Sequence, residues 1–570
     1  MHVATTRRQH KDKVYETHLL RRSYREDGKV KNETLANLSH LPAEVIELVR
    51  QALAGKSHVV AGEGFDIERS LPHGHVAAVW AVADKLGLPA LLGPPCPQRD
   101  LAMALIVARV CKPASKLATM RWWADTTMAG DVGVAGAGTD EVYEAMDWLV
   151  SRQDSIEAGL ARRHLGPGAM VYFDLSSSWM EGSHCPLAAR GYSRDAKTGK
   201  AQIEYGLMTD DAGRPVAVEV FAGNTADPTA FVAAVAKVRE RFGLEKVVMV
   251  GDRGMITSAR IDAIRDLGDL EWITALRSPA IAKLVADGSL QLGLFDQVNL
   301  AEITHPDFPG ERLVACKNPL LAVERTRKRA ELLDATETLL APIAASVRAG
   351  RLADADKIGV RIGKVINRHK MAKHFELTIT DTALSWARKA NQIAAEAALD
   401  GLYVIRTSLP ATTLDTAAVV GAYKNLANVE RDFRSLKAID LDLRPIYHHL
   451  EDRVRAHVQI CMLAAYLVWH LRQAWAPICF TDDNPPARTD PVAPATRSDT
   501  AKTKDTRRQN DRGEPVHDLA TLLNHLATLT RNTIVFNGGI RIDKLATPTP
   551  LQHRAFELIG APIPTHLPTM

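Results

Sequence analysis

Residues 168–182 read GAMVYFDLSSSWMEG, and the apolar run at their centre, MVYFDL, has the length and composition of a buried β-strand. Two further strand-like runs follow, QIEYGLMTD at 202–210 and RPVAVEVFAG at 214–223, and the sequence DDAGR between them is typical of a turn. We therefore expect three consecutive strands that are joined by hairpins.

After the third run the pattern changes to an alternation of helices and strands. An amphipathic helix is predicted at 227–244, a fully apolar strand at 246–252, a second helix at 258–268 and a further strand at 271–277. Three hairpin-linked strands followed by helix, strand, helix and strand is the order of an RNase H-like mixed sheet. The predicted fold class is α/β, with an RNase H-like mixed-sheet core.

Other segments surround this core. A charge-rich stretch with helical periodicity precedes the next predicted strand at 401–408, which indicates a large insertion domain, and the segment upstream of the core is mainly helical in pattern. The sequence after Ala476 is rich in Pro, Thr, Asp and Arg, so a disordered linker is expected there. The predicted organisation is a basic β-hairpin element at 1–41, a helical region at 42–165, the core at 166–277 and 401–480, the insertion domain at 278–400, the linker at 481–515 and a tail element at 516–570.

The charge is unevenly distributed along the chain. The formal net charge of +4 points only weakly to a polyanionic partner. Residues 1–40, however, carry nine Lys or Arg and five Asp or Glu, and Asp27-Gly28 is a hairpin signal because both residues tolerate positive φ angles. This end of the chain is therefore expected to form a small basic β element that can meet a phosphate backbone.

The six cysteines contain no C-x-x-C pair, which argues against a zinc ribbon and a disulfide framework and fits a reducing cytoplasm. The N-terminus has no signal-peptide pattern, and the most apolar helix, around residues 460–471, is expected to be too short and too interrupted to span a bilayer. We expect a soluble cytoplasmic chain without a membrane partner.

Two aspartates end apolar strands of the predicted core. Asp174 closes MVYFDL, and Asp252 closes KVVMVGD two residues before Gly254. A carboxylate at a strand end points into the crevice where ligands of such sheets bind, but an aspartate there can equally cap the following turn. If the two strands are neighbours, the carboxylates converge, and they then need a cation or a shared proton between them.

A third acidic group lies in residues 423–437, YKNLANVERDFRSLK. The apolar residues recur at intervals of three and four, as in the buried stripe of a helix: Leu426, Val429, Phe433 and Leu436. Tyr423, Glu430 and Lys437 recur every seven residues on another face. Glu430 is either a surface ion-pair partner for Arg434 or a third ligand for hard cations such as Mg²⁺. In the second case the surrounding cations would bind phosphates: Lys424, Arg431, Arg434 and Lys437.

These residues resemble the DDE transposases of bacterial insertion sequences, in the Insertion Sequence Four-like superfamily with the signature Y-x-x-R-x-x-x-E-x-x-x-x-x-x-K. Tyr423, Glu430 and Lys437 occupy three signature positions at the right spacing, and Asp174 and Asp252 match the two aspartates. The likeness extends over most of the chain, from the basic hairpin to RPIYHHLEDRVRAHVQICMLA at 444–464. The signature arginine is replaced by Leu426.

The resemblance implies an enzyme that cuts DNA at the ends of the element and joins the freed 3′ hydroxyl to target DNA. Asp174, Asp252 and Glu430 would hold two Mg²⁺ or Mn²⁺ ions. The implied partners are double-stranded DNA, at the element's ends and at the target, and a second copy of the chain, with residues 42–165 serving DNA binding or dimerisation. Tyr423 and Lys437 would contact phosphates, as would Arg253, and Trp272 would either stack on a flipped base or pack in the core.

Two alternative readings remain. A catalytically inactive or domesticated relative would bind DNA and cut nothing, and the replacement at Leu426 keeps this reading open. A phosphohydrolase with Asp174 as nucleophile usually carries a second aspartate two residues later, where this chain has Ser176. One further cluster, His449, Arg453 and His457, recurs every four residues on a predicted helix and is read as a packed helix with a polar, DNA-facing side.

Overall fold

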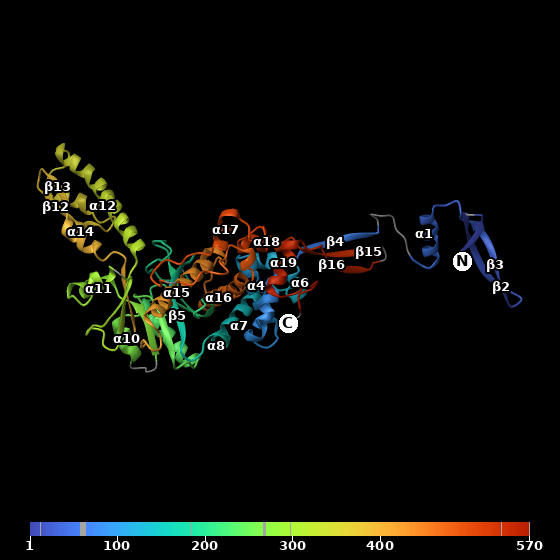
Figure 1. Cartoon of the computed structure of the whole chain (residues 1–570), viewed down its shortest axis with the longest axis horizontal. Helices are drawn as coiled ribbons and strands as arrows, with labels where there is room; N and C mark the ends of the chain where they lie inside the picture. Colours follow the sequence, from blue (N-terminus) through green and yellow to red (C-terminus); the bar gives the residue numbers. More distant parts are fainter. Residues whose placement is uncertain are drawn as a thin grey trace. The chain divides into compact units, whose positions relative to one another are not determined.

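The computed structural model describes residues 1–11, 13–56, 64–182, 184–265, 270–296, 298–488, 490–536 and 539–568. The chain divides into two compact units, each built from segments that are distant in sequence (Figure 1). The first, here called the terminal unit, comprises Met1–Pro72 with Leu529–Pro548. The second, the core unit, comprises His73–Thr528 with Thr549–Met570.

The terminal unit begins with a three-stranded antiparallel sheet of β1 (His2–His10), β2 (Lys13–Glu26) and β3 (Lys29–Asn37), followed by α1 (Ala43–Leu53). Asp27 and Gly28 both have positive φ angles, 51° and 74°, between β2 and β3. This is the geometry of the expected two-residue hairpin turn. The predicted basic hairpin is confirmed, and β1 extends it to a third strand.

A second sheet in the terminal unit joins the two ends of the sequence. It has the order β16, β15, β4 and consists of β4 (Phe65–Pro72), β15 (Thr530–Phe536) and β16 (Arg541–Leu545). Phe65 lies opposite Phe536 in the antiparallel β4–β15 pair. The helical region expected at 42–165 is thus interrupted by a strand, and the tail expected at 516–570 contributes to both units.

The core unit is built on an eight-stranded mixed sheet with the order β10-β11-β14-β9-β8-β5-β6-β7. Its first five strands in chain order are β5 (Ala169–Trp179), β6 (Gln202–Thr209), β7 (Pro215–Ala222), β8 (Val247–Gly251) and β9 (Leu270–Ala275). β5 pairs antiparallel with β6 and parallel with β8, so these strands lie in the order third, second, first, fourth, fifth. The predicted RNase H-like mixed sheet is confirmed.

Helices connect these strands as expected. They are α9 (Asp227–Ala236), which continues as the π-helical turn η1 (Lys237–Arg241), and α10 (Ser258–Arg265). The predicted end of the latter helix, at 266–268, lies outside the described residues.

The segment expected as an insertion at 278–400 contributes two strands to the sheet, because β11 pairs with β14 (Leu402–Thr407) and β10 pairs with β11. The remainder has its own hydrophobic cluster around Leu340, Ile358 and Ile362. The elements of the segment are α11 (Ser278–Ala286), η2 (Leu292–Phe295), β10 (Leu300–Ile303), β11 (Arg312–Lys317), α12 (Pro319–Arg348), α13 (Ala355–Gly363), η3 (Ala372–His374), β12 (Phe375–Ile379), β13 (Leu384–Arg388) and α14 (Ala390–Ala397).

Helices that precede the first strand of this sheet in the sequence, and helices that follow its last strand, pack with the sheet into the largest hydrophobic cluster. They are α2 (Gly74–Lys85), α3 (Leu88–Leu92), α4 (Pro97–Cys111), α5 (Lys116–Ala124), α6 (Met128–Val132), α7 (Thr139–Ser151), α8 (Gln153–His164), α15 (Thr416–Arg434), η4 (Ser435–Ile439), α16 (Glu451–Ala474) and η5 (Ala476–Ile478). With 24 residues, α16 is longer than expected and passes a length and composition test for a membrane span, but 83% of its apolar window is buried inside the protein. Such burial is what a core helix shows, and α16 packs against α4, α7 and β7.

The structure differs from the expected disordered linker at 481–515. This stretch contains α17 (Asp499–Arg507), whose first turn is capped by the Ser498 hydroxyl accepting from Ala501 N–H. The buried ammonium of Lys504 donates to the carbonyls of Ala476 and Thr481. Polar contacts fix this segment to the rest of the core unit. For this reason the search for periodic apolar residues did not predict its helix. It is followed by α18 (Leu519–Ala527) and, after the strands of the terminal unit, by α19 (Pro550–Ile559).

Candidate active site

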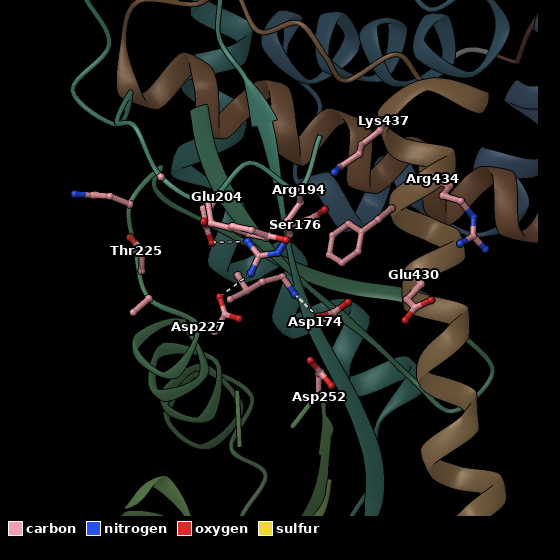
Figure 2. A pocket seen from close by; sticks show the side chains of 16 residues that line it. Asp174, Ser176, Arg194, Glu204, Thr225, Asp227, Asp252, Glu430, Arg434 and Lys437 are labelled. Carbon is pink, nitrogen blue, oxygen red and sulfur yellow. Dashed lines mark hydrogen bonds and ion pairs between the residues drawn. The ribbon is translucent and has the colours of Figure 1, made fainter. Parts of the chain in front are cut away.

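Two predicted site residues lie side by side on two neighbouring inner strands of the sheet. β5 and β8 run parallel with Phe173 opposite Gly251. Asp174 follows Phe173 inside β5, which continues to Trp179 and does not end at the aspartate as expected, whereas Asp252 directly follows the last residue of β8. The two carboxylates face the same space (Figure 2). One oxygen of each accepts a hydrogen bond from the backbone N–H of the following residue, at 2.8 and 2.7 Å respectively, which fixes the orientation of both groups.

Helix α15 brings Glu430 to this space. Its apolar face is buried as predicted, with Val429 and Phe433 in the core, and Phe433 meets the Tyr205 ring edge-on at 5.6 Å between centroids. The helix packs on β5 and β8, the two strands that carry the aspartates. Glu430 lies on the exposed side of the helix and points towards Asp174 and Asp252 (Figure 2).

The three carboxylates line one cavity of about 750 Å³, the candidate active site, which is called the catalytic cavity below. Burial, and then the charges of Asp252 and Glu430, raise the pKa of Asp174 to about 7, although the Leu175 N–H acts in the opposite direction. Asp174 is therefore partly protonated near neutral pH as long as no cation offsets its neighbours. The cavity concentrates negative charge.

This donor set fits a hard divalent cation. Among the described residues, no three His, Cys, Asp or Glu side chains already stand at the spacing of metal ligands. Mg²⁺, however, keeps several of its waters and is usually bound through one or two carboxylates together with substrate phosphates. Three carboxylates line one cavity, and the pKa of one of them, Asp174, is raised first by burial and then by the other two, so together they provide the oxygen ligands and negative charge that such an ion requires.

The other signature positions lie along the same helix. Tyr423 lines a smaller adjoining cavity with Asp174, Asp252 and Glu430. Burial, followed by the charge of Asp252, raises the pKa of Tyr423, so its hydroxyl stays protonated and can donate a hydrogen bond. Leu426 is buried in the core and also borders this cavity.

The predicted DNA contacts differ in accessibility. Arg431 and Arg434 are exposed on α15, and Arg434 borders the catalytic cavity. Arg253 is exposed beside Asp252. These three guanidinium groups are free to approach a phosphate.

Lys424 and Trp272, two further predicted DNA contacts, make contacts within the protein. The Lys424 ammonium donates to the carbonyls of Pro491, Val492 and Ala493, so its three N–H groups are used within the protein. Trp272 is 3% exposed in β9 and its indole N–H donates to Glu311, at 3.3 Å. In this structure both side chains are engaged within the protein, and Trp272 packs in the core as the alternative reading had it, so the predicted DNA contacts of Lys424 and Trp272 stay predictions.

Lys437 lines the catalytic cavity but is buried in η4. Its ammonium donates to Asp195 Oδ1 at 2.7 Å, and Arg444 donates to the same oxygen. Burial lowers the pKa of Lys437, and the Asp195 carboxylate acts in the opposite direction. The side chain is therefore held in the cavity wall by an ion pair.

Sequence reasoning missed an arginine and two further acids in the cavity. Arg194 donates to Glu204 at 2.9 Å and to Asp227 at 2.6 Å (Figure 2). Its backbone N–H donates to the Ser177 hydroxyl. One guanidinium thus bridges the two carboxylates and offsets one of their two charges, which separates them in role from Asp174, Asp252 and Glu430. The sequence could have revealed Glu204, because it is a glutamate inside the otherwise apolar strand QIEYGLMT. Asp227 gives no such signal, because it resembles an ordinary acid in the first turn of a helix.

Comparison with known proteins gives two family matches. Residues 181–467 match the family described as "Transposase DDE domain", and residues 3–63 match "IS1634 family transposase, N-terminal domain". A search of curated proteins finds no match. Among solved structures, the chain is similar to the piggyBac transposase synaptic complex with hairpin DNA, with 9% identity over 79% of this chain and 76% of that one and a TM-score of 0.36.

Proposed function

Because the chain belongs to the transposase DDE domain family, we propose that it moves an insertion sequence by cutting DNA and joining its ends to a target at the cavity of Asp174, Asp252 and Glu430. The observation that carries this assignment is the meeting of three carboxylates, from β5, the end of β8 and α15, around one cavity. They are separated in sequence by up to 256 positions, from 174 to 430.

In this proposal the three carboxylates hold two divalent cations, Mg²⁺ or Mn²⁺, which when bound activate an attacking oxygen and stabilise a leaving one at a phosphodiester. Arg434, Arg431 and Arg253 bind backbone phosphates beside the cavity. The Tyr423 hydroxyl donates to a phosphate oxygen at the adjoining cavity. Asp174, protonated in part without a cation, gives up that proton when the site is loaded.

We further propose that the chain belongs to the Insertion Sequence Four-like, Y-R-E-K branch of the family. The support is the spacing of Tyr423, Glu430 and Lys437 along α15 and η4. The branch arginine has become Leu426, which is buried, so the exposed arginines of the helix take over phosphate binding. A homodimer that brings two DNA ends together and a location in the bacterial cytoplasm, at the nucleoid, complete the proposal.

Metal removal tests the reaction class. The full-length chain is incubated with duplex DNA that carries the ends of its own element, in Mg²⁺ and in EDTA. Nicking at the element's end is expected with Mg²⁺ and is expected to disappear with EDTA, because the carboxylates then lack their cations. Gel electrophoresis of end-labelled strands measures it. A gel shift without any nick in Mg²⁺ or Mn²⁺ would instead support the inactive, DNA-binding alternative.

Arg434→Ala tests the phosphate contacts of α15. We expect weaker binding of the element's end, and a slope of log affinity against log salt that is less steep by about 1, because one phosphate contact is lost. Lys424→Met is the matched control, since Lys424 lies on the same helix and is occupied by backbone carbonyls. Fluorescence anisotropy at several salt concentrations measures both. A salt slope unchanged in Arg434→Ala would rule out the contact.

A further inference from the structure

A second cavity lies in the core unit, outside the catalytic one. It has a volume of about 440 Å³. The end of α4, the start of α5, α16 and the segment that follows η4 provide its walls. Its lining is rich in cationic and imidazole side chains: Arg109, Lys116, Arg444, His448 and His457.

Two of these cations are buried. Arg109 is 4% exposed, and its guanidinium donates to the backbone carbonyls of Leu441 and Ala114. Lys116 is 5% exposed, and its Nζ lies 3.2 Å from His457 Nδ1. The opposite nitrogen of His457, Nε2, lies 3.0 Å from the Leu443 carbonyl oxygen. Because a carbonyl can only accept, Nε2 carries the proton and Nδ1 accepts from Lys116.

The charge of these side chains is not balanced. In the part of the chain that the structure describes, no carboxylate forms an ion pair with Arg109 or Lys116, and Asp442 is the one acid in the lining. Burial, and then the charge of Arg109, lower the pKa of Lys116 to about 7. Burial and the charge of Lys116 likewise hold the pKa of His457 well below its usual range. Buried cations without a counter-ion are costly, so an anion that entered this cavity would be strongly favoured.

The cavity is bordered by exposed residues, and one ion-pair cluster links its wall to that of the catalytic cavity. Tyr447 and Leu117, in its lining, are 61% and 50% exposed. Arg444 lines this cavity and Lys437 lines the catalytic one, and both donate to Asp195 Oδ1. Asp195 therefore links a residue in the wall of one cavity to a residue in the wall of the other.

We propose that this cavity, here called the Lys116 cavity, binds a backbone phosphate of the DNA that occupies the catalytic cavity. Lys116 uses one N–H for His457 and has two further donors for phosphate oxygens. The proposal rests on the proposed function, which supplies DNA as the ligand, and adds to it a phosphate-binding site away from the reacting carboxylates.

The test asks whether the loss of one phosphate charge and the loss of the Lys116 ammonium have non-additive effects on DNA affinity. End DNA is prepared with a neutral methylphosphonate at one position at a time, and binding to the full-length chain is measured by anisotropy. At one position outside the cleavage site, wild type is expected to lose about tenfold in affinity, whereas Lys116→Met is already weaker by a similar factor and loses almost nothing more. Lys112→Met, an exposed lysine four residues away, is the matched control and should keep the wild-type pattern.

Three results would overturn the proposal. The first is an equal loss of affinity for Lys116→Met and wild type at every methylphosphonate position. The second is the same loss of coupling in Lys112→Met. The third is binding of inorganic phosphate that DNA does not compete with, which would mark a free-anion site. The methylphosphonate series on wild type alone must show the sensitive position, so the test stands even if Lys116→Met does not fold. Binding is measured here and nicking in the separate Mg²⁺ assay, so coupling without any nicking would refute the reaction class and leave the cavity assignment intact.

Discussion

Glu430→Ala is expected to abolish detectable strand cleavage while the affinity for the element's end stays within roughly tenfold of wild type. The glutamate is one of three carboxylates around the cavity, whereas the exposed arginines that would hold the phosphates remain. Glu430 is itself exposed, so the fold should be unaffected, and the melting temperature should stay that of wild type. A nicking assay in Mg²⁺ and an anisotropy titration measure the two quantities.

Asp432→Asn is the matched control for this variant. Asp432 lies on the same helix but does not line the catalytic cavity, and burial raises its pKa to about 7, so that asparagine imitates its neutral form. Cleavage by Asp432→Asn should remain close to wild type. Normal cleavage by Glu430→Ala, or equal losses in the two variants, would contradict the assignment of Glu430 as a metal ligand.

Lys237→Met is expected to lower the free energy of unfolding by about 3–5 kcal/mol, because it leaves a buried carboxylate without its cation. The Lys237 ammonium, 2% exposed, contacts Glu157 at 2.8 Å and Glu219 at 2.7 Å, and Glu157 is fully buried. Gln153 and the Val218 N–H still donate to Glu157, but neither carries charge. Urea denaturation at pH 7 measures the change.

Two comparisons make that prediction specific. Arg241 is on the same π-helical turn and pairs with Asp154 at the surface, so Arg241→Met should cost less than about 1 kcal/mol. The double variant Lys237→Met with Glu157→Gln should regain part of the lost stability, because the buried charge is gone. Equal destabilisation by Lys237→Met and Arg241→Met would show that the buried pair is not special.

The parts of the site that sequence could predict are those fixed by local periodicity. Apolar runs that end in Asp174 and Asp252 define two strands of one sheet, and the three-and-four spacing of Val429 and Phe433 places Glu430 on a different face of its helix. The sheet register then follows from the order of elements. For this reason the core fold and the gathering of the three carboxylates could be anticipated.

The parts that could not be predicted depend on partners far away in the sequence. The Lys424 ammonium donates to backbone carbonyls at 491–493, and the Lys437 ammonium donates to Asp195. Trp272 is buried in the sheet, and its indole N–H donates to Glu311. For each of these three residues, the residue type and the neighbouring sequence are compatible with a DNA contact. Only the tertiary fold shows that its polar atoms are already used.

The pairing of β4 with β15 has a consequence for how the protein is made. During synthesis on the ribosome, the strand that ends at Pro72 emerges long before the strand that begins at Thr530. This sheet can close only after nearly all of the polypeptide has been translated, since a strand cannot pair with a partner that does not yet exist. Until then the backbone edge of β4 is unprotected, and nascent chains stalled before residue 530 should be more prone to aggregation than complete ones.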